Sequence, residues 1–362
     1  MRLSRYFDAP VVPLSAPGLL IVGTVENDTL VGSSADDQIN GREGSDSLSG
    51  GAGDDTLWGG GHWDRLQGEA GDDVLVSGGV GGWLEGGDGN DRLFSDAQYG
   101  RLVGGAGDDV IHGKFDERID AGEGHDYVVV DTATQVALGA GDDFLVVHRR
   151  ALSVTDPGGR NTMYGGEYGD AFSVSGVNTV FGRGGNDSIE SYGGDSVLDG
   201  GDGADRVVGY GGSNCFIGGL GDDILIAHDG LDLLDGGAGD DRIFSEGNGN
   251  DIMVGGEGLD WFGFETPQAG NNLVVDFNLV QDRLLFSGAA FGGYDLEDWL
   301  VAGQNLIVGS QSAVTHQIPT FFYDVDDGSV YFDADGTGSL AYVFIVRLNG
   351  APAIGPAHFA FY

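Results

Sequence analysis

Residues 48–57 read LSGGAGDDTL, and this pattern decides the fold because it returns along the chain at a fixed spacing. It recurs as LEGGDGNDRL at 84–93 and as LVGGAGDDVI at 102–111. Every ninth position is apolar in two long series. The first comprises Leu30, Ile39, Leu48, Leu57, Leu66, Leu75, Leu84, Leu93, Leu102 and Ile111; the second comprises Val180, Ile189, Leu198, Val207, Phe216, Leu225, Leu234 and Ile243, then Met253 and Phe262 one residue later. A period this regular predicts a repeat architecture.

A second column, most often Asp, stands two residues before each apolar position, and glycines precede it. Complete G-G-x-G-x-D units begin at Gly50, Gly86, Gly104, Gly200, Gly218, Gly236 and Gly255. Glycine permits positive φ and close approach of the backbone to a ligand. Carbonyl and carboxylate oxygens converging from such a turn suit Ca²⁺ and suit zinc poorly. Each unit is therefore a turn and a short strand, and stacked units would bury a continuous apolar column.

The predicted calcium ligands are the Asp carboxylates and the Gly residues of these turns. The Asp candidates are Asp28, Asp37, Asp46, Asp55, Asp64, Asp73, Asp91, Asp109, Asp126, Asp143, Asp187, Asp205, Asp223, Asp232, Asp241, Asp251 and Asp260. The Gly candidates are Gly51, Gly53, Gly87, Gly89, Gly105, Gly107, Gly201, Gly203, Gly219, Gly221, Gly237, Gly239, Gly256 and Gly258.

This repeat resembles the nonapeptide of the RTX, or hemolysin-type, family of calcium-binding proteins. The resemblance covers about residues 23–263 and begins with GTVENDTL at 23–30. It implies an all-β chain folded as a parallel β-roll, a right-handed solenoid with two nonapeptides per turn and Ca²⁺ between turns. The stretches 322–324 and 331–336 resemble the C-terminal part of serralysin-type RTX proteins, which implies a β-rich cap. A cap is also expected because the last turn would otherwise leave its strand edge open.

The resemblance also implies secretion, because RTX proteins leave bacteria through a type I secretion system that reads an uncleaved C-terminal signal. The apolar tail HFAFY at 358–362 is the candidate signal, and the alternative is that it forms the last strand of the cap. We therefore expect a protein that is extracellular or at the surface of a bacterium. An extracellular or cell-surface polymer is a candidate partner.

Sorting the Asp column in steps of 18 residues predicts two unequal edges of the roll. In the first block one edge keeps Asp from Asp37 to Asp109, while the other loses it at Gly82 and Gly100. The second block keeps Asp187, Asp205, Asp223, Asp241 and Asp260 on one edge, and has Asn178, Ser196 and Asn214 before Asp232 and Asp251 on the other. If each stacked Asp pair frames one ion, the chain binds about 11 Ca²⁺, and the middle adds a few. The depleted edges reflect either drift at dispensable sites or another contact surface.

The repeats divide the chain into five parts. We expect an N-terminal segment at 1–22, a first roll block at 23–112 and a second at 182–263. Residues 113–181 carry irregular repeats, and either continue one roll or join two. Residues 264–362 form the cap and the secretion region, with a predicted hairpin of 329–332 and 340–348.

Composition excludes several classes of protein. The 362 residues include 70 Gly, 58 acidic and 16 basic residues, giving a formal net charge of −42. This charge disfavours binding to nucleic acid and to anionic membranes. No apolar run is long enough to span a membrane, and the single Cys215 excludes an intrachain disulfide. Disorder is disfavoured because the apolar residues are periodic.

No catalytic motif is present. The seven His include no H-E-x-x-H pair, and no G-x-S-x-G elbow occurs. We therefore expect no enzyme, and a structural or binding module instead. The alternative is an extracellular enzyme that acts on polysaccharide along the depleted edge of the roll.

Overall fold

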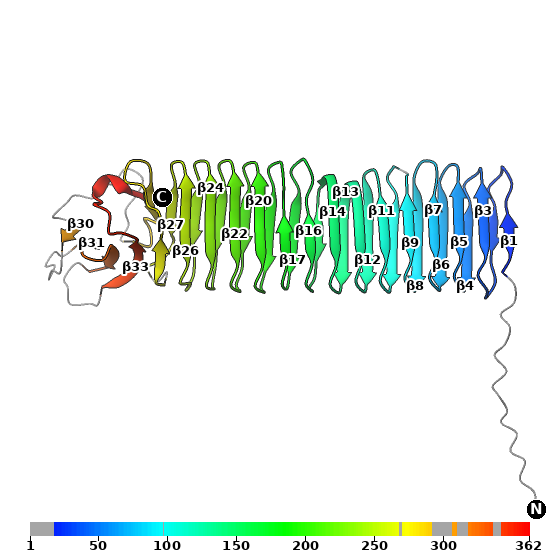
Figure 1. The fold of residues 1–362 in the computed structure, drawn as a ribbon, viewed down its shortest axis with the longest axis horizontal. Coiled ribbons are helices and arrows are strands. Elements are labelled where there is room, and N and C mark those ends of the chain that lie inside the picture. The colour runs from blue at the N-terminus through cyan, green and yellow to red at the C-terminus, as the bar shows by residue number, and fades with distance from the viewer. Residues whose placement is uncertain (1–17, 97, 268–269, 292–305, 310–317, 336–341) are drawn as a thin grey trace, which may run out of the picture.

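The chain forms one long β-solenoid with a smaller cap at its C-terminal end (Figure 1). The computed structural model describes residues 18–96, 98–267, 270–291, 306–309, 318–335 and 342–362. The expected N-terminal segment therefore lies mostly outside the described residues, as do parts of the cap, including most of the turn of the predicted hairpin.

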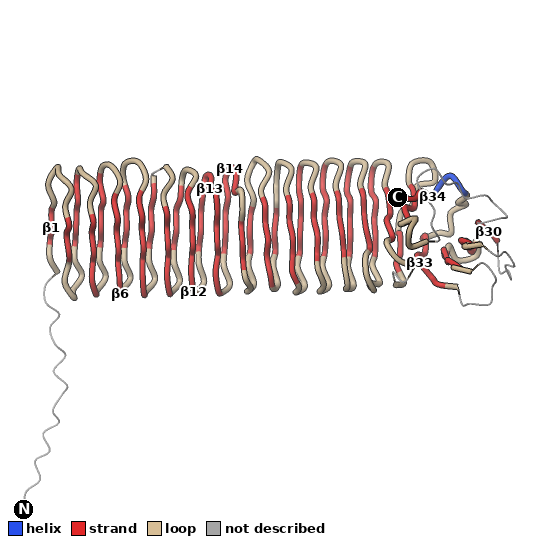
Figure 2. The backbone as a smooth tube through the Cα atoms, turned by 180° about the vertical axis from the view of Figure 1, so that it is seen from behind, coloured by secondary structure: helices blue, strands red, loops and turns tan. Residues whose placement is uncertain are grey.

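Two parallel sheets, called sheet A and sheet B, form the walls of the solenoid (Figure 2). The chain alternates between them, so a strand pairs with the strand two places later. In sheet A, β3 (Gln38–Arg42) pairs with β5 (Thr56–Gly60) in the register Ile39↔Leu57. In sheet B, β4 (Ser47–Ala52) pairs with β6 (Asp64–Ala70) in the register Leu48↔Leu66. One turn is thus 18 residues, and the predicted parallel β-roll of two repeats per turn is confirmed, with about 16 turns.

The remaining strands extend the same two sheets. Sheet A also contains β1 (Leu20–Val22), β7 (Val74–Ser77), β9 (Arg92–Ser95), β11 (Val110–Gly113), β14 (Phe144–Ala151), β16 (Thr162–Tyr164), β18 (Thr179–Phe181), β20 (Val197–Asp202), β22 (Cys215–Leu220), β24 (Leu233–Ala238), β26 (Ile252–Glu257) and β28 (Asn272–Val274). Sheet B also contains β2 (Thr29–Val31), β8 (Gly82–Asp88), β10 (Arg101–Ala106), β12 (Glu117–Glu123), β15 (Val154–Asp156), β17 (Ala171–Ser175), β19 (Ser188–Tyr192), β21 (Arg206–Gly209), β23 (Ile224–Ala227), β25 (Arg242–Ser245), β27 (Trp261–Phe264) and β29 (Arg283–Phe286).

The core is a double column of apolar side chains between the sheets. Successive strand residues point to opposite faces, so a short strand places its central Leu or Ile inside and its neighbours outside. Leu48, Leu57, Leu66 and Leu75 are all fully buried, and the same holds along both columns through most of the roll. Each such side chain contributes roughly 1.5–3 kcal/mol on burial. One side chain per nine residues is a thin core, so the turns matter for stability.

The irregular middle continues the same roll without a break. Here several turns shorten to 17 residues, as in the pairings Leu102↔Ile119 and Ile119↔Val136. Strand β13 (Tyr127–Ala140) runs through both sheets, because its first half pairs with β11 and β14 and its second half with β12 and β15. The two repeat blocks are therefore joined by continuous strand pairing.

The cap covers the last turn. It contains β30 (Leu306–Gly309), β31 (Thr320–Asp324), β32 (Ser329–Asp333), β33 (Val343–Leu348), the 3₁₀ turn Pro356–His358 and β34 (Phe359–Phe361). The antiparallel pair β32–β33 matches the expected hairpin strands, while β33 and β34 extend sheets A and B by pairing with β28 and β29. The tail at 359–361 is thus a strand, with Phe359 and Phe361 buried. Among the described residues, no helix is long and apolar enough to cross a membrane.

Candidate metal centre

The Asp residues of the repeats line the two edges where the chain passes between the sheets. Edge A denotes the turns that lead into sheet A, and includes Asp37; edge B denotes the turns that lead into sheet B, and includes Asp28. On both edges the backbone N–H of one Asp donates to Oδ1 of the Asp in the next turn. Fifteen such bonds join, on edge A, Asp37–Asp55–Asp73–Asp91–Asp109–Asp126–Asp143 and Asp232–Asp251, and on edge B, Asp28–Asp46–Asp64 and Asp170–Asp187–Asp205–Asp223–Asp241–Asp260–Asp282.

The second carboxylate oxygen of most of these residues is buried and has no hydrogen-bond partner. This holds for Oδ2 of Asp46, Asp55, Asp64, Asp73, Asp91, Asp109, Asp126, Asp143, Asp187, Asp205, Asp223, Asp241 and Asp260. Buried polar groups almost always have a partner, because an unsatisfied one costs about 1–3 kcal/mol. A repeated orphan oxygen of this kind indicates that the site is completed by something other than protein.

The glycine turns bring further oxygens to the same place. A β-carbon built on Gly86 would collide with Oδ2 of Asp91 and with the carbonyl oxygen of Gly104 in the next turn. A β-carbon on Gly105 would collide with the carbonyl oxygen of Gly87 in the preceding turn. The fourteen predicted Gly residues all have positive φ, between +98° and +144°, which side chains rarely adopt. Only glycine allows the backbones of adjacent turns to approach each other this closely.

For carboxylates in the interior of these series, burial beside like charges disfavours the ionised form when no cation is bound. Burial is the largest cause that raises the pKa of Asp73 to about 7. The hydrogen bond from the Asp55 N–H lowers this pKa, and the carboxylates of Asp91 and Asp55 raise it again. Burial likewise raises the pKa of Asp109 and Asp223 to about 7. A cation between successive turns would remove this penalty.

The donor set selects the kind of cation. Within the described part of the chain, no three His, Cys, Asp or Glu side chains gather in a metal-holding group. The converging donors are instead backbone carbonyls and Asp carboxylates, all of them oxygens. Hard oxygen ligands from a turn fit Ca²⁺, which accepts six to eight oxygens in flexible geometry. These residues therefore fit calcium.

The family model of the RTX calcium-binding nonapeptide repeat (4 copies) matches residues 22–57, 41–75, 82–101, 100–128, 173–207, 181–216, 217–247 and 229–262. These segments cover more than half of the chain. The chain belongs to the RTX calcium-binding repeat family. The repeats of this family bind Ca²⁺, in agreement with the oxygen-lined turns described above. No curated protein matches the sequence significantly.

The sequence alone does not predict which edge of the roll carries the acidic turns in each repeat block. Edge A keeps Asp up to Asp143, then places Asn161, Asn178, Ser196 and Asn214 at the same position before Asp232. Edge B does the reverse, because Asp28, Asp46 and Asp64 precede a depleted stretch and the unbroken series then runs from Asp170 to Asp282. The fully acidic edge of the first block is thus the depleted edge of the second.

Two members of the edge B series, Asp170 and Asp282, are absent from the predicted ligands. Asp170 closes the turn GGEYGD at 165–170, in which the third glycine is displaced by one position. Asp282 lies 22 residues beyond Asp260, outside the repeat period, yet the Asp260 N–H donates to its Oδ1 at 3.2 Å. The imperfect repeat at 165–170 was a signal in the sequence from which Asp170 could be found. The place of Asp282 in the series is visible only in the folded structure.

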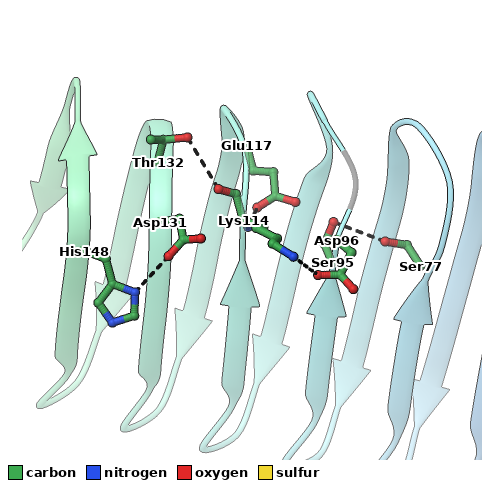
Figure 3. Close-up of polar contacts among 8 residues, drawn as sticks. All are labelled: Ser77, Ser95, Asp96, Lys114, Glu117, Asp131, Thr132 and His148. Atoms are coloured by element: carbon green, nitrogen blue, oxygen red, sulfur yellow. Dashed lines mark hydrogen bonds and ion pairs between the residues drawn. The ribbon is translucent and has the colours of Figure 1, made fainter.

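The depleted stretch of edge B is closed by contacts between side chains (Figure 3). Ser77 and Ser95 are joined through their hydroxyls at 3.1 Å, and Lys114 Nζ lies 3.1 Å from Oδ1 of Asp96. The buried Glu117 accepts the backbone N–H of Lys114 at 2.6 Å. Glu117 stands at the position that Asp holds in other turns, but Gly100 and Ala133 occupy this position in the neighbouring turns. It therefore has no carboxylate to pair with along this edge.

Proposed function

We propose that this RTX chain is a secreted structural or binding module, without catalytic activity, whose β-roll folds on binding extracellular Ca²⁺. The observation that carries the proposal is the series of fifteen stacked Asp pairs, because most of them include a buried Oδ2 without a partner. The ligands are the seventeen Asp residues and the Gly residues named from the sequence, together with Asp170 and Asp282.

We infer one ion per stacked pair, and therefore about 15 Ca²⁺ rather than about 11. The four additional pairs are Asp109–Asp126, Asp126–Asp143, Asp170–Asp187 and Asp260–Asp282. Fifteen divalent ions would neutralise about 30 of the 42 negative charges in excess, on this count. Calcium thus relieves the repulsion that a thin core cannot overcome.

Calcium binding contributes enough free energy to act as a folding switch. Extracellular calcium modules bind with Kd of about 10⁻⁴–10⁻³ M. At a free concentration about tenfold above Kd, each site stabilises the fold by about 1.4 kcal/mol, so 15 sites together contribute on the order of 20 kcal/mol. That exceeds the ~5–15 kcal/mol stability of a typical domain. In a calcium-poor cytosol the chain stays unfolded and fits a type I exporter; outside it folds.

The experiment combines native mass spectrometry with circular dichroism of the full chain. We expect about 15 bound Ca²⁺ in millimolar calcium and a loss of most strand signal in chelator. Equal Mg²⁺ should not restore the signal, because Mg²⁺ demands a tight octahedral shell that these turns do not offer. A chelated sample that keeps its full strand signal and a sharp thermal transition contradicts the proposal.

A further inference from the structure

On edge A the series of bonds from a backbone N–H to a side-chain oxygen of the next turn is called the ladder. It continues from the acidic stretch, Asp37–Asp143, through the neutral stretch, Asn161–Asn214. The N–H of Asp143 donates to Oδ1 of Asn161 at 2.6 Å, and that of Asn178 to Oγ of Ser196 at 3.0 Å. The N–H of Asn214 then donates to Oδ1 of Asp232 at 2.6 Å, where the acidic series resumes. The hydrogen-bond ladder of this edge therefore continues where its Asp residues are replaced by Asn and Ser.

In three of the four neutral turns, all but that of Asn161, the side chain itself donates to a turn carbonyl. Nδ2 of Asn178 donates to the carbonyl oxygen of Ser175 at 2.8 Å, and Nδ2 of Asn214 to that of Gly211 at 3.1 Å. In an acidic turn the corresponding atom is the orphan Oδ2, an acceptor that leaves the carbonyls available to a cation. An amide NH₂ in that position both satisfies a carbonyl and repels a cation.

Two turns of the neutral stretch, those before Ser196 and Asn214, also have a different glycine conformation. Gly193, Gly194, Gly211 and Gly212 have φ between +81° and +85°, whereas the fourteen predicted ligand glycines lie between +98° and +144°. The turns before Ser196 and Asn214 therefore differ from the complete repeats in glycine conformation as well as in charge.

On edge B, a basic residue stands where the acidic series begins. Nε of Arg150 donates to the carbonyl oxygen of Gly169 at 3.1 Å, and its charge acts on the neighbouring carboxylate of Asp170. The turn before Asp170 has Leu152 at the Asp position, so no carboxylate pair can form there. The guanidinium of Arg150 thus lies at the N-terminal end of the Asp170–Asp282 series. Earlier on the same edge, the ammonium group of Lys114 contacts Asp96.

We propose, building on the calcium-driven roll proposed above, that calcium fills two main columns on opposite edges, Asp37–Asp143 on edge A and Asp170–Asp282 on edge B. The short runs Asp28–Asp64 and Asp232–Asp251 bind the remaining ions. The intervening turns, at 161–214 on edge A and 82–152 on edge B, are closed by amide, hydroxyl and cationic side chains and take no calcium. Residues 144–169 then form a calcium-free joint between the two columns, because the buried Asp156 pairs in register with Val174 and has no carboxylate beside it in the next turn.

Side-chain packing stabilises the joint, where we propose that no calcium binds. Tyr127 and Phe144 stack with ring centroids 5.4 Å apart, and Tyr164 and Phe181 stack at 5.0 Å. The guanidinium of Arg183 lies 4.8 Å from the centroid of the Tyr164 ring. Stacked rings and a cation over a ring both stabilise a solvent-facing sheet surface. The two longest strands, β13 and β14, also meet here.

Two matched substitutions test the proposal by counting ions with native mass spectrometry in saturating calcium. Asn214→Asp creates one new carboxylate pair with Asp232, so the count should rise by one. Asn178→Asp lies between Asn161 and Ser196, creates no pair and should leave the count unchanged. Equal gains for the two variants, or a wild-type count near 20, would overturn the two-column arrangement.

Removal of side chains gives a second measurement that does not depend on a new site. Asn214→Ala should keep all ions, whereas Asp205→Ala on edge B of the same region should lose two, because Asp205 belongs to two stacked pairs. A lower count for Asn214→Ala would show that calcium uses the neutral turns and refute the proposal. A wild-type chain that binds no calcium at all would instead refute the proposed function.

Discussion

Two stretches of edge A, Asp37–Asp143 and Asn161–Asn214, share one hydrogen-bond ladder and differ in charge. In both, a side-chain oxygen accepts the backbone N–H of the preceding turn at 2.6–3.2 Å. In the first, a second buried oxygen is left without a partner for most members, whereas in the second the side chain ends in an amide or a hydroxyl. Asp thus performs two separable tasks, which are to hold adjacent turns in register and to attract a cation.

On edge A, the Asn and Ser side chains explain why the depleted turns do not interrupt the roll. An Asn or Ser supplies the acceptor that the ladder needs, and a neutral side chain avoids the cost of burying an anion. The register continues through the neutral stretch, with pairings such as Val180↔Leu198 and Leu198↔Phe216. Edge A therefore keeps a ladder oxygen in each turn from Asp55 to Asp251, whereas the proposed calcium sites require two adjacent carboxylates.

The largest expected effect comes from removing a carboxylate inside a calcium column. Asp73→Ala removes the ladder acceptor of Asp55 and one ligand of two stacked sites. Losing two sites at about 1.4 kcal/mol each and a ladder bond of about 1 kcal/mol should lower the free energy of unfolding by about 4 kcal/mol. Asp64→Ala, at the end of a short run, affects one framed site and should cost about 2 kcal/mol.

Calcium titrations of the two variants side by side, followed by circular dichroism, measure this difference. The midpoint for folding should rise more for Asp73→Ala than for Asp64→Ala. Equal midpoints would mean that the carboxylates do not act in stacked pairs.

A substitution with a smaller expected effect distinguishes the contribution of the ladder bond from that of calcium binding at one position. Asp73→Asn keeps an oxygen that can accept the Asp55 N–H but removes the charge, which imitates the neutral stretch. We expect a loss near 3 kcal/mol in saturating calcium, about 1 kcal/mol less than for Asp73→Ala. Chemical unfolding of both variants at one calcium concentration measures this difference. Identical stabilities would show that the ladder bond contributes nothing there.

The sequence predicts the roll well because its signal is local and repeated. One apolar residue in nine, such as Leu48 and Leu57, specifies a short strand with one inward side chain, and the family model matches the same repeats. Asp and Gly positions within complete repeats are also predictable, since the turn chemistry lies in six adjacent residues. All fourteen predicted Gly have the expected positive φ.

The relation between the two blocks is not predictable in this way, because it depends on turn length. Turns of 17 residues, such as that from Ile111 to Val128, change the spacing, so steps of 18 no longer identify residues on one edge. Only strand pairing shows that the column of Asp109 continues to Asn178. Asp282 was missed for the same reason, since its place in the column follows from a 22-residue connection.

Within the neutral stretch, removing a ladder side chain should lower the free energy of unfolding without changing calcium binding. Asn178→Ala removes the acceptor for the Asn161 N–H and the Nδ2 bond to the Ser175 carbonyl. Leaving these buried groups unsatisfied costs about 1–3 kcal/mol. Thermal unfolding in saturating calcium should detect the loss, while the calcium midpoint per site and the ion count stay at wild-type values. A reduced ion count would contradict this assignment.

The smallest effect is expected at the joint, where Arg150 donates to the turn before Asp170. Arg150→Met keeps most of the aliphatic stem and removes the Nε bond to the Gly169 carbonyl. Because the residue is exposed, the lost bond should cost at most about 1 kcal/mol, visible as a slightly lower unfolding temperature in saturating calcium. The ion count should not change, because Leu152 in the preceding turn offers no carboxylate to form a new pair with Asp170. A gain of one ion in Arg150→Met would show that the guanidinium excludes calcium from a site that the turns can otherwise form. The calcium-free joint would then be maintained by this arginine, and not by the absence of a paired carboxylate.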